Sequence, residues 1–270
     1  MNPARYEGGN VLKAGIDMGS VMVKCVIVNG ETIIAKSAAR NGPMPEIIAD
    51  TVLQQALKNA EIDFSLIEKI VCTGYGRYIF TKAHATVTEI SAAAKASFLL
   101  SGKQRCLVID IGGQDTKIIE VDHNGEVVDF LMNDKCAAGT GRFLEMMAGV
   151  LGTDLHGFGT LSLKAERPVT INATCSVFAE SEVISLLAHN EKKDNIAAGL
   201  LNAIAGRIST MLNHFQSQIP VFFCGGPAEI PGLKQAIEKI SGRNIRIFDN
   251  PGFVVAYGAA LCVFPQIEPI

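Results

Sequence analysis

One β-rich pattern occurs twice in this 270-residue chain. The first copy, VLKAGIDMGSVMVKCVIVNGETIIAKSAA, predicts a strand, a tight glycine turn, a second strand, another turn and a third strand. The second copy, RCLVIDIGGQDTKIIEVDHNGEVVDFLMN, repeats this order. In each copy an apolar strand ends in an acid (Asp17 or Asp110), and a lysine (Lys24 or Lys117) follows on the returning strand. Two unrelated hairpins would not need matching offsets, so the repeat predicts a duplicated fold with a cleft between its halves.

Turn and helix signals complete an α/β pattern in both halves. Asn-Gly pairs at residues 29–30 and 124–125 predict hairpin turns. Apolar residues at helical spacing and apolar runs predict helices over Pro45–Asn59, Val87–Leu100, Asp194–Phe215 and Phe253–Val263. We expect a first lobe over residues 1–101 plus 254–270 and a second lobe over residues 102–253.

The acid and the glycines at each turn suit phosphate chemistry. Glycine lets backbone N–H groups approach phosphate oxygens closely. A carboxylate at a strand end can hold Mg²⁺ through water, and a lysine on the next strand can neutralise phosphate charge. Both hairpins, together with CGGP after a late strand, therefore predict a nucleotide site.

Composition and charge exclude several classes of protein. The net charge is −3 and no basic stripe stands out, which argues against nucleic-acid binding. The longest apolar stretch, VVAYGAALCVF, is too short to cross a bilayer, so we expect no membrane association. The first ten residues, MNPARYEGGN, contain no apolar core of a signal peptide, and seven scattered cysteines argue against a disulfide framework. These features predict a protein of the reducing cytoplasm.

Several of these motifs resemble known families. DMGSVMVK resembles the first phosphate loop of actin, DIGGQDTK a second phosphate loop of the actin/Hsp70/sugar-kinase superfamily, and CGGPAEIPG its adenosine motif. More narrowly, TGYGR, VTEIS, DIGGQDTK, NDKCAAGTGRF and TCSVFAESEVIS are similar, in that order, to the activator component of 2-hydroxyacyl-CoA dehydratases. That group belongs with the BadF-type ATPase subunits of benzoyl-CoA reductases. The likeness extends from Leu12 to Val263.

This resemblance implies a fold, an activity and partners. The fold is an α/β, actin/Hsp70-like ATPase with two ribonuclease-H-like lobes and an interlobe nucleotide cleft. The activity is that of a homodimeric ATPase that binds ATP, ADP and Mg²⁺ and passes low-potential electrons through a [4Fe-4S] cluster. The electron donor would be a reduced ferredoxin or flavodoxin, and the acceptor a dehydratase or an acyl-CoA reductase.

The resemblance also implies roles for individual residues. Catalytic roles go to Asp17, Glu89, Asp110 and Gln114. Nucleotide contacts go to Gly19, Ser20 and Lys24, to Gly112, Gly113 and Lys117, and to Gly139, Thr140, Gly141, Gly225 and Gly226. Asp17 would organise Mg²⁺, and Glu89 would position the attacking water unless it is an ordinary exposed acid of its helix. Val21 departs from the family, which often has threonine there, so one hydroxyl contact to the nucleotide is missing.

The seven cysteines divide into two classes. Five lie in apolar strands or helices and are expected to be small buried hydrophobes: Cys25, Cys72, Cys106, Cys224 and Cys262. Cys136 and Cys175 instead directly precede predicted helices, whose N-termini stabilise thiolates. An iron–sulfur cluster typically needs four thiolates, and a twofold dimer would bring two from each subunit. We therefore expect these two cysteines to ligate a bridging cluster, the alternative being incidental surface thiols.

Three classes of function remain open from the residues alone. An ATP-driven electron donor accounts for the two helix-preceding cysteines. A small-molecule kinase would use the same phosphate loops and needs a carboxylate base, a role that Asp115 could fill, but it has no need of Cys136 or Cys175. An actin-like filament former would need an extended polymer surface, and no large insertion supplies one. Iron content distinguishes the electron donor from both alternatives.

Overall fold

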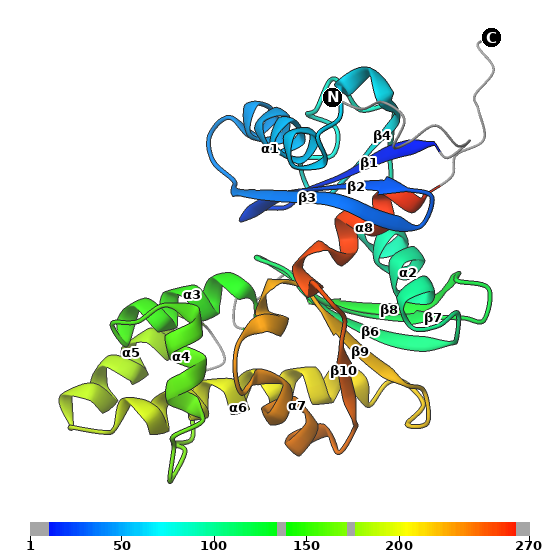
Figure 1. Ribbon diagram of the computed structural model, residues 1–270. Coiled ribbons are helices and arrows are strands. Elements are labelled where there is room, and N and C mark those ends of the chain that lie inside the picture. Colours follow the sequence, from blue (N-terminus) through cyan, green and yellow to red (C-terminus); the bar gives the residue numbers. More distant parts are fainter. Residues whose placement is uncertain (1–10, 134–138, 172–175, 263–270) are drawn as a thin grey trace. The chain divides into compact units, whose positions relative to one another are not determined.

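The structure, a computed structural model, describes residues 11–133, 139–171 and 176–262 (Figure 1). These residues form two compact units. The first unit comprises the described part of Met1–Gln104, His123–Val127 and Phe253–Ile270, and the second that of Arg105–Asp122 and Val128–Gly252. Each unit contains one mixed β-sheet and several helices, as the sequence predicts.

The first unit is built on a five-stranded sheet in the order β3-β2-β1-β4-β5. Its strands are β1 Leu12–Met18, β2 Met22–Asn29, β3 Thr32–Arg40, β4 Ile67–Thr73 and β5 Ala85–Thr86. Its helices are α1 Pro45–Ala60, α2 Glu89–Leu100 and α8 Val254–Leu261, with a short 3₁₀ turn at Phe64–Leu66; another 3₁₀ turn, Pro251–Phe253, lies where the chain passes from the second unit back to the first. Strand β1 pairs antiparallel with β2 and parallel with β4, which in turn pairs parallel with β5.

The second unit has the same sheet plan, in the order β10-β9-β6-β7-β8. Its strands are β6 Cys106–Ile111, β7 Thr116–Val121, β8 Val127–Asn133, β9 Val221–Cys224 and β10 Ile245–Ile247. Its helices are α3 Gly141–Val150, α4 Leu155–Ser162, α5 Ser176–Ala188, α6 Lys193–Leu212 and α7 Leu233–Ser241, with a 3₁₀ turn at Gly226–Glu229. In register, Asp17 pairs with Lys24 across the first hairpin and Asp110 with Lys117 across the second. The predicted duplication is therefore confirmed.

Alternation along β1 separates the core of the first unit from its polar groups. Ile16 and Met18 point to a core that they share with α1, whereas Asp17 points to the opposite face of the sheet. That opposite face is covered by α8, and Figure 1 shows α1 and α8 on the two sides of the sheet. The approach is close, because a Cβ on Gly15 would lie 2.0 Å from the carbonyl oxygen of Ala256. Asp17 is thus fixed at the end of a strand that is packed on both faces.

The second unit buries one face of its sheet under helices α3 to α7 (Figure 1). The longest helix, α6, spans 20 residues and ends at Leu212, three residues before the predicted end. Its buried stripe contains Ile196, Leu200, Ile204 and Ile208 at the expected helical spacing.

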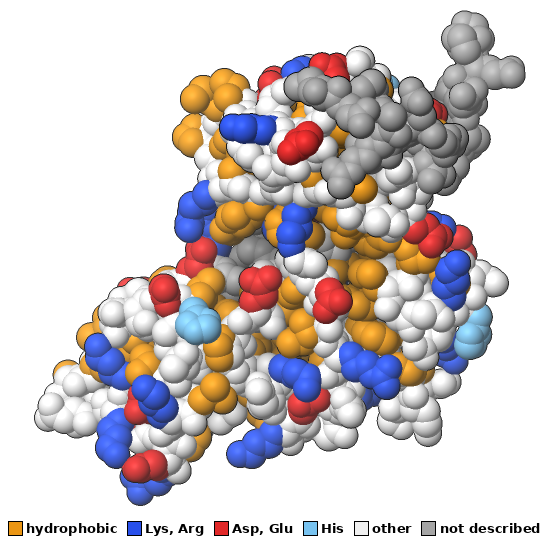
Figure 2. Space-filling view, viewed as in Figure 1, with side chains coloured by type: hydrophobic (Ala, Val, Ile, Leu, Met, Phe, Trp, Pro, Cys, Tyr) orange, Lys and Arg blue, Asp and Glu red, His pale blue; other side chains and the backbone are white. Residues whose placement is uncertain are grey.

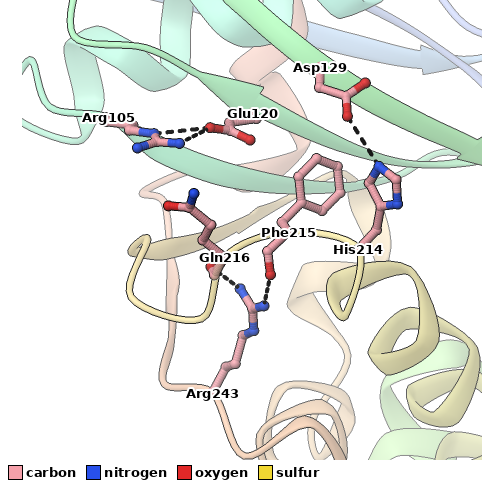
Figure 3. A network of polar contacts seen from close by, with 7 residues as sticks. All are labelled: Arg105, Glu120, Asp129, His214, Phe215, Gln216 and Arg243. Atoms are coloured by element: carbon pink, nitrogen blue, oxygen red, sulfur yellow. Dashed lines mark hydrogen bonds and ion pairs between the residues drawn. The ribbon is translucent and has the colours of Figure 1, made fainter.

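A network of polar contacts lies in the second unit, at the end of the sheet away from Asp110 (Figure 3). Arg105 donates from Nε to Glu120 Oε1 over 2.9 Å, and His214 Nε2 lies 3.2 Å from Asp129 Oδ2. Arg243 donates to the carbonyl oxygens of Phe215 and Gln216, which follow α6, over 2.6 and 3.1 Å. Burial lowers the pKa of Arg243. These contacts join strand and helix ends, so we assign the network a structural role.

The surface carries both signs of charge. Figure 2 shows lysine and arginine interspersed with aspartate and glutamate over the face in view, in keeping with the net charge of −3. No helix in the described ranges is long and apolar enough to span a bilayer.

Candidate functional site

The carboxyl ends of three parallel strands bring polar residues together in the first unit. Asp17 is paired in register with Thr73 at the ends of β1 and β4. The next strand along, β5, is held to β4 by Val87 N–H donating to the Cys72 carbonyl over 2.9 Å, and it leads directly into α2 at Glu89. Ligands of open α/β sheets bind outside such carboxyl ends, at the point where the order of the strands reverses. The structure thus places Asp17, Thr73 and the start of α2 along one edge.

Glu89 stands at the first position of α2 and is half-buried. Thr88 caps this helix, because its hydroxyl accepts the Ser91 N–H over 3.1 Å. An acid in the first turn also stabilises a helix through the macrodipole. The position of Glu89 is therefore compatible with both roles considered above, and its part in orienting water stays a prediction.

Asp17 is a buried carboxylate with a cationic neighbour. Its side chain is 7% exposed, and its Oδ2 lies 3.6 Å from Lys24 Nζ. The Lys24 side chain keeps 18% of its surface exposed, so its ammonium can turn toward a bound anion. A carboxylate and a lysine in this arrangement can hold a hydrated cation and a phosphate oxygen side by side.

The turn between β1 and β2 is held by a residue that the sequence motifs did not indicate. Asn41, directly after β3, donates from Nδ2 to the Gly19 carbonyl over 2.7 Å and from its backbone N–H to the Val21 carbonyl over 2.7 Å. Gly19 and Ser20 are partly exposed between these two anchors. The Asn-Gly pair after β3 is a turn signal, but its contact with a turn 22 residues earlier depends on the sheet.

We expect Asn41→Ala to weaken nucleotide binding by roughly threefold to tenfold, because one hydrogen bond that fixes the first phosphate loop is lost. Asn59→Ala is the matched control, since Asn59 Nδ2 also donates to a backbone carbonyl of the first unit, that of Lys36, over 3.1 Å at the exposed end of α1. Isothermal titration with ADP checks both variants. Equal affinities for the two variants would contradict the role given to Asn41.

The carboxyl ends of β6 and β9 in the second unit correspond to those of β1 and β4 in the first. Asp110, 4% exposed, is the penultimate residue of β6 and is paired in register with Cys224 at the end of the parallel strand β9. Gly225 follows with a φ of +89°, and a Cβ there would lie 2.2 Å from the Ile111 carbonyl oxygen and 3.0 Å from Asp110 Oδ1. Its N–H donates to the Pro251 carbonyl over 3.0 Å. The chain thus bends tightly over the acid at a position that suits glycine alone.

A buried ion pair lies behind the second phosphate loop. Lys117 Nζ is 2.6 Å from Asp115 Oδ1, and the two side chains are 2% and 3% exposed. The backbone carbonyl of Asp115 also accepts the Gly112 N–H over 2.9 Å, while Gln114 is exposed at the tip of the turn. Lys117 therefore contacts a carboxylate of its own loop, and a direct contact of Lys117 with phosphate stays a prediction.

The second phosphate loop is bonded to the N-terminus of α3. The N–H groups of Gly141 and Arg142 donate to the carbonyls of Gly112 and Gly113 over 2.8 and 3.0 Å. In addition, Thr116 Oγ1 donates to the carbonyl of Gly139 over 2.8 Å. The first N–H groups of α3, which have no partner within the helix, thus donate to carbonyls of the loop.

The start of α3 corrects one prediction. The helix does not follow Cys136 directly but begins at Gly141, because Gly139 has a φ of +121° and Thr140 is an extended N-cap. By contrast, α5 begins at Ser176, immediately after Cys175, as predicted. Cys136 and Cys175 themselves lie outside the described residues.

The other cysteines are poor sources of thiolate. Cys25, Cys72, Cys106 and Cys224 are buried, as predicted, whereas Cys262 is half-buried where α8 ends. Burial raises the pKa of Cys72 to about 12, with the negative charge of Asp17 as a smaller cause, and burial also raises the pKa values of Cys25 and Cys262. Within the part of the chain that the structure describes, no cluster of three or more histidine, cysteine or acidic side chains could hold a metal.

The described residues fit a magnesium nucleotide. Each unit presents a buried acid near the end of its central strand, and the chain turns tightly over that acid at a glycine, where a Cβ would collide with the acid and the neighbouring backbone. In the first unit, a buried hydroxyl at Thr73 has no hydrogen-bond partner in the described structure. Unsatisfied buried polar groups are rare, and a bound ligand or its water is one way to satisfy them.

Comparison with known proteins agrees with this chemistry. The model of the BadF/BadG/BcrA/BcrD ATPase family matches residues 14–263. The (R)-2-hydroxyglutaryl-CoA dehydratase activating ATPase of Acidaminococcus fermentans is 38% identical over 260 residues, which cover 95% of this chain and 98% of that protein. The chain therefore matches this relative over nearly its whole length.

Solved structures support the fold. The activator of the 2-hydroxyisocaproyl-CoA dehydratase from Clostridium difficile, with bound ADPNP, superposes with a TM-score of 0.87 at 38% identity, covering 93% of each chain. A ROK hexokinase from Thermus thermophilus superposes with a TM-score of 0.54 at 15% identity, covering 93% of this chain and 97% of that one, and shows the fold alone. The predicted actin-like ATPase fold class is confirmed.

Proposed function

Since the chain belongs to the BadF/BadG/BcrA/BcrD ATPase family, we propose that it is an ATP-hydrolysing activator that delivers low-potential electrons to a 2-hydroxyacyl-CoA dehydratase or a related acyl-CoA reductase. Two relatives support the class of acceptor. One is named as an activating ATPase of a 2-hydroxyacyl-CoA dehydratase. Another, 29% identical over 263 residues, is one of the subunits of the benzoyl-CoA reductase of Thauera aromatica.

In this proposal the first unit binds Mg²⁺ and the phosphates of ATP and positions the attacking water. Asp17 holds the hydrated Mg²⁺ that accompanies the nucleotide, and Lys24 neutralises phosphate charge beside it. Gly19 and Ser20 contact the phosphates in the turn that Asn41 fixes. Glu89 orients the attacking water, whose oxygen forms the new bond to the γ-phosphorus as the bond to ADP breaks.

The second unit supplies the remaining nucleotide contacts. Asp110 and Gln114 are the other two proposed catalytic residues. The proposed phosphate contacts are Gly112, Gly113 and Lys117 with the adjoining turn of Gly139, Thr140 and Gly141. Gly225 and Gly226 pass under the adenosine. The tight bend at Gly225 supports this assignment, because only glycine lets the backbone turn this closely over Asp110 and the end of β6.

One observation carries the coupling of ATP to electron transfer. The N–H groups of Gly141 and Arg142 are bonded to the carbonyls of the second phosphate loop. A shift of this loop on loss of the γ-phosphate therefore moves the start of α3, which lies five residues after Cys136 in the sequence. Such a two-state change is a common way in which nucleotides drive a distant site.

Cys136 and Cys175 are the proposed cluster ligands, two from each subunit of a homodimer. A [4Fe-4S] cluster, when bound, supplies one-electron transfer at low potential. The electron comes from a reduced ferredoxin or flavodoxin and passes to the acceptor. The protein works in the reducing cytoplasm. Transferring one electron to an acceptor whose reduction potential is about 300 mV lower requires ~7 kcal/mol, which is within reach of ATP hydrolysis.

The kinase alternative gains no support. The carboxylate that it would use, on Asp115, is 3% exposed and ion-paired with Lys117. The likeness to a hexokinase, at 15% identity, extends to the fold alone.

Reconstitution with a dehydratase tests the proposed function. The protein, purified and reduced without oxygen, is mixed with the (R)-2-hydroxyglutaryl-CoA dehydratase and with the lactoyl-CoA dehydratase of its relatives' systems. We expect dehydration to begin on addition of Mg²⁺ and ATP and to fail with a non-hydrolysable ATP analogue. Hydrolysis of ATP with no electron reaching either acceptor would contradict the proposal.

A further inference from the structure

The duplication extends beyond the two hairpins to the turns that follow β4 and β9. Asp17 is paired with Thr73 in the first unit just as Asp110 is paired with Cys224 in the second. Each pair is followed by a glycine with a φ of +89°, Gly74 or Gly225. The sequence TGYG therefore occupies the place in the first unit that CGGP occupies in the second.

Both glycines bend the chain over the strand-end acid. A Cβ on Gly74 would lie 2.6 Å from the Met18 carbonyl and 2.9 Å from Asp17 Oδ1. The corresponding distances at Gly225 are 2.2 Å to the Ile111 carbonyl oxygen and 3.0 Å to Asp110 Oδ1. The first turn is also tied to β1, because Gly76 N–H donates to the Met18 carbonyl over 3.1 Å. The TGYG turn is thus held against the proposed magnesium site.

The two turns differ in the side chain that precedes the glycine. Cys224 is a fully buried thiol with little need of a strong hydrogen bond. Thr73 is equally buried, at 0% exposure, but its hydroxyl finds no hydrogen-bond partner in the described structure. Leaving a buried hydroxyl unsatisfied is unfavourable, so a purely structural role would be better served by an apolar side chain.

Strand pairing shows which face of the sheet carries the Thr73 side chain. Residues paired in register on neighbouring strands project to the same face of a sheet, so Thr73 and Asp17 share a face. Strand β4 lies between β1 and β5. Thr73 is therefore placed between Asp17 and the strand that leads to Glu89.

Resting on the proposed ATPase activity, we propose that Thr73 is a further binding residue of that site. Its hydroxyl forms a hydrogen bond with a water molecule in the hydration shell of the nucleotide's Mg²⁺. Magnesium keeps several of its waters in protein sites, and each needs partners. Asp17 can accept from some of these waters, and Thr73 offers the next polar group along the same edge of the sheet.

Thr73→Val tests this inference, because it removes the hydroxyl and keeps the shape of the side chain. We expect the thermal midpoint of the nucleotide-free variant to equal or exceed that of the wild type. We expect its Kd for the magnesium complex of a non-hydrolysable ATP analogue to rise about tenfold, while its Kd for the analogue in excess chelator stays within about twofold. Thr73→Ser, which keeps the hydroxyl, should bind the magnesium complex like the wild type.

Three outcomes would overturn the inference. A lower midpoint of the nucleotide-free Thr73→Val protein would show that the hydroxyl is bonded within the fold. Unchanged affinity for the magnesium complex would show that it contacts no ligand, and an equal loss with and without Mg²⁺ would rule out a magnesium-bound water. A wild-type protein that binds no nucleotide would refute the proposed function as well, so the two failures are distinguishable.

Discussion

Replacing Asp17 with asparagine should lower ATP turnover by about a hundredfold to a thousandfold. The substitution keeps the size of the side chain and removes the charge that is expected to hold hydrated Mg²⁺ at the end of β1. The Lys24 side chain, whose Nζ lies 3.6 Å from the carboxylate, is 18% exposed to solvent. Its ammonium can therefore be solvated in the variant, so the fold should persist. Phosphate release measured at saturating Mg²⁺ and ATP checks the turnover, and circular dichroism checks the fold.

Asp50→Asn is the matched control for Asp17→Asn. Asp50 is an aspartate of the same unit that pairs with Lys82 at the surface of α1, with 39% of its side chain exposed. Removing a surface ion pair of this kind has little energetic effect, so its ATP turnover should equal that of the wild type. Asp17→Asn with wild-type turnover would refute the magnesium site at the first sheet edge.

Replacing Cys136 or Cys175 with serine should abolish electron delivery and iron binding while nucleotide affinity is retained. A bridging cluster that loses one ligand from each subunit loses two of its four thiolates, and it should not survive purification. The nucleotide contacts of both units are made by other residues, so ADP should still bind with the affinity of the wild type. Iron analysis, the visible spectrum and ADP titration of each variant together measure the expected split.

Cys262→Ser is the control for the two cysteine variants. Cys262 is half-buried at the end of α8, and burial raises its pKa, so it is expected to take no part in metal binding. This variant should keep both its iron and its activation of the dehydratase. Loss of iron on Cys262→Ser, or full iron content after Cys136→Ser, would contradict the assignment of ligands.

The duplicated hairpins could be predicted because their signals are local. An acid, glycines and a lysine at fixed offsets specify a strand, a turn and a returning strand, and the register of each hairpin follows. The same holds for α5 after Cys175, whose start is given by the sequence around it. The predicted number of residues between Cys136 and its helix was wrong, because the φ of Gly139 is set by contacts with the second phosphate loop.

The supporting residues of the site could not be predicted in this way. Asn41 reaches the Gly19 turn only because β3 is folded back beside β2. Thr73 meets Asp17 only because β4 pairs parallel with β1 after an intervening helix. The near-complete burial of Lys117 against Asp115 is decided by the packing of the second unit. Contacts between distant segments leave no fixed spacing in the sequence.

At the centre of the proposed mechanism, two subunits share one iron–sulfur cluster. Iron and acid-labile sulfide per subunit, measured with the molecular mass in solution on anaerobically purified protein, test this sharing most directly. We predict a dimer with about four irons and about four sulfides, equivalent to about two of each per subunit. A colourless protein that remains free of iron after anaerobic reconstitution, or a monomer that retains a complete cluster, would contradict it.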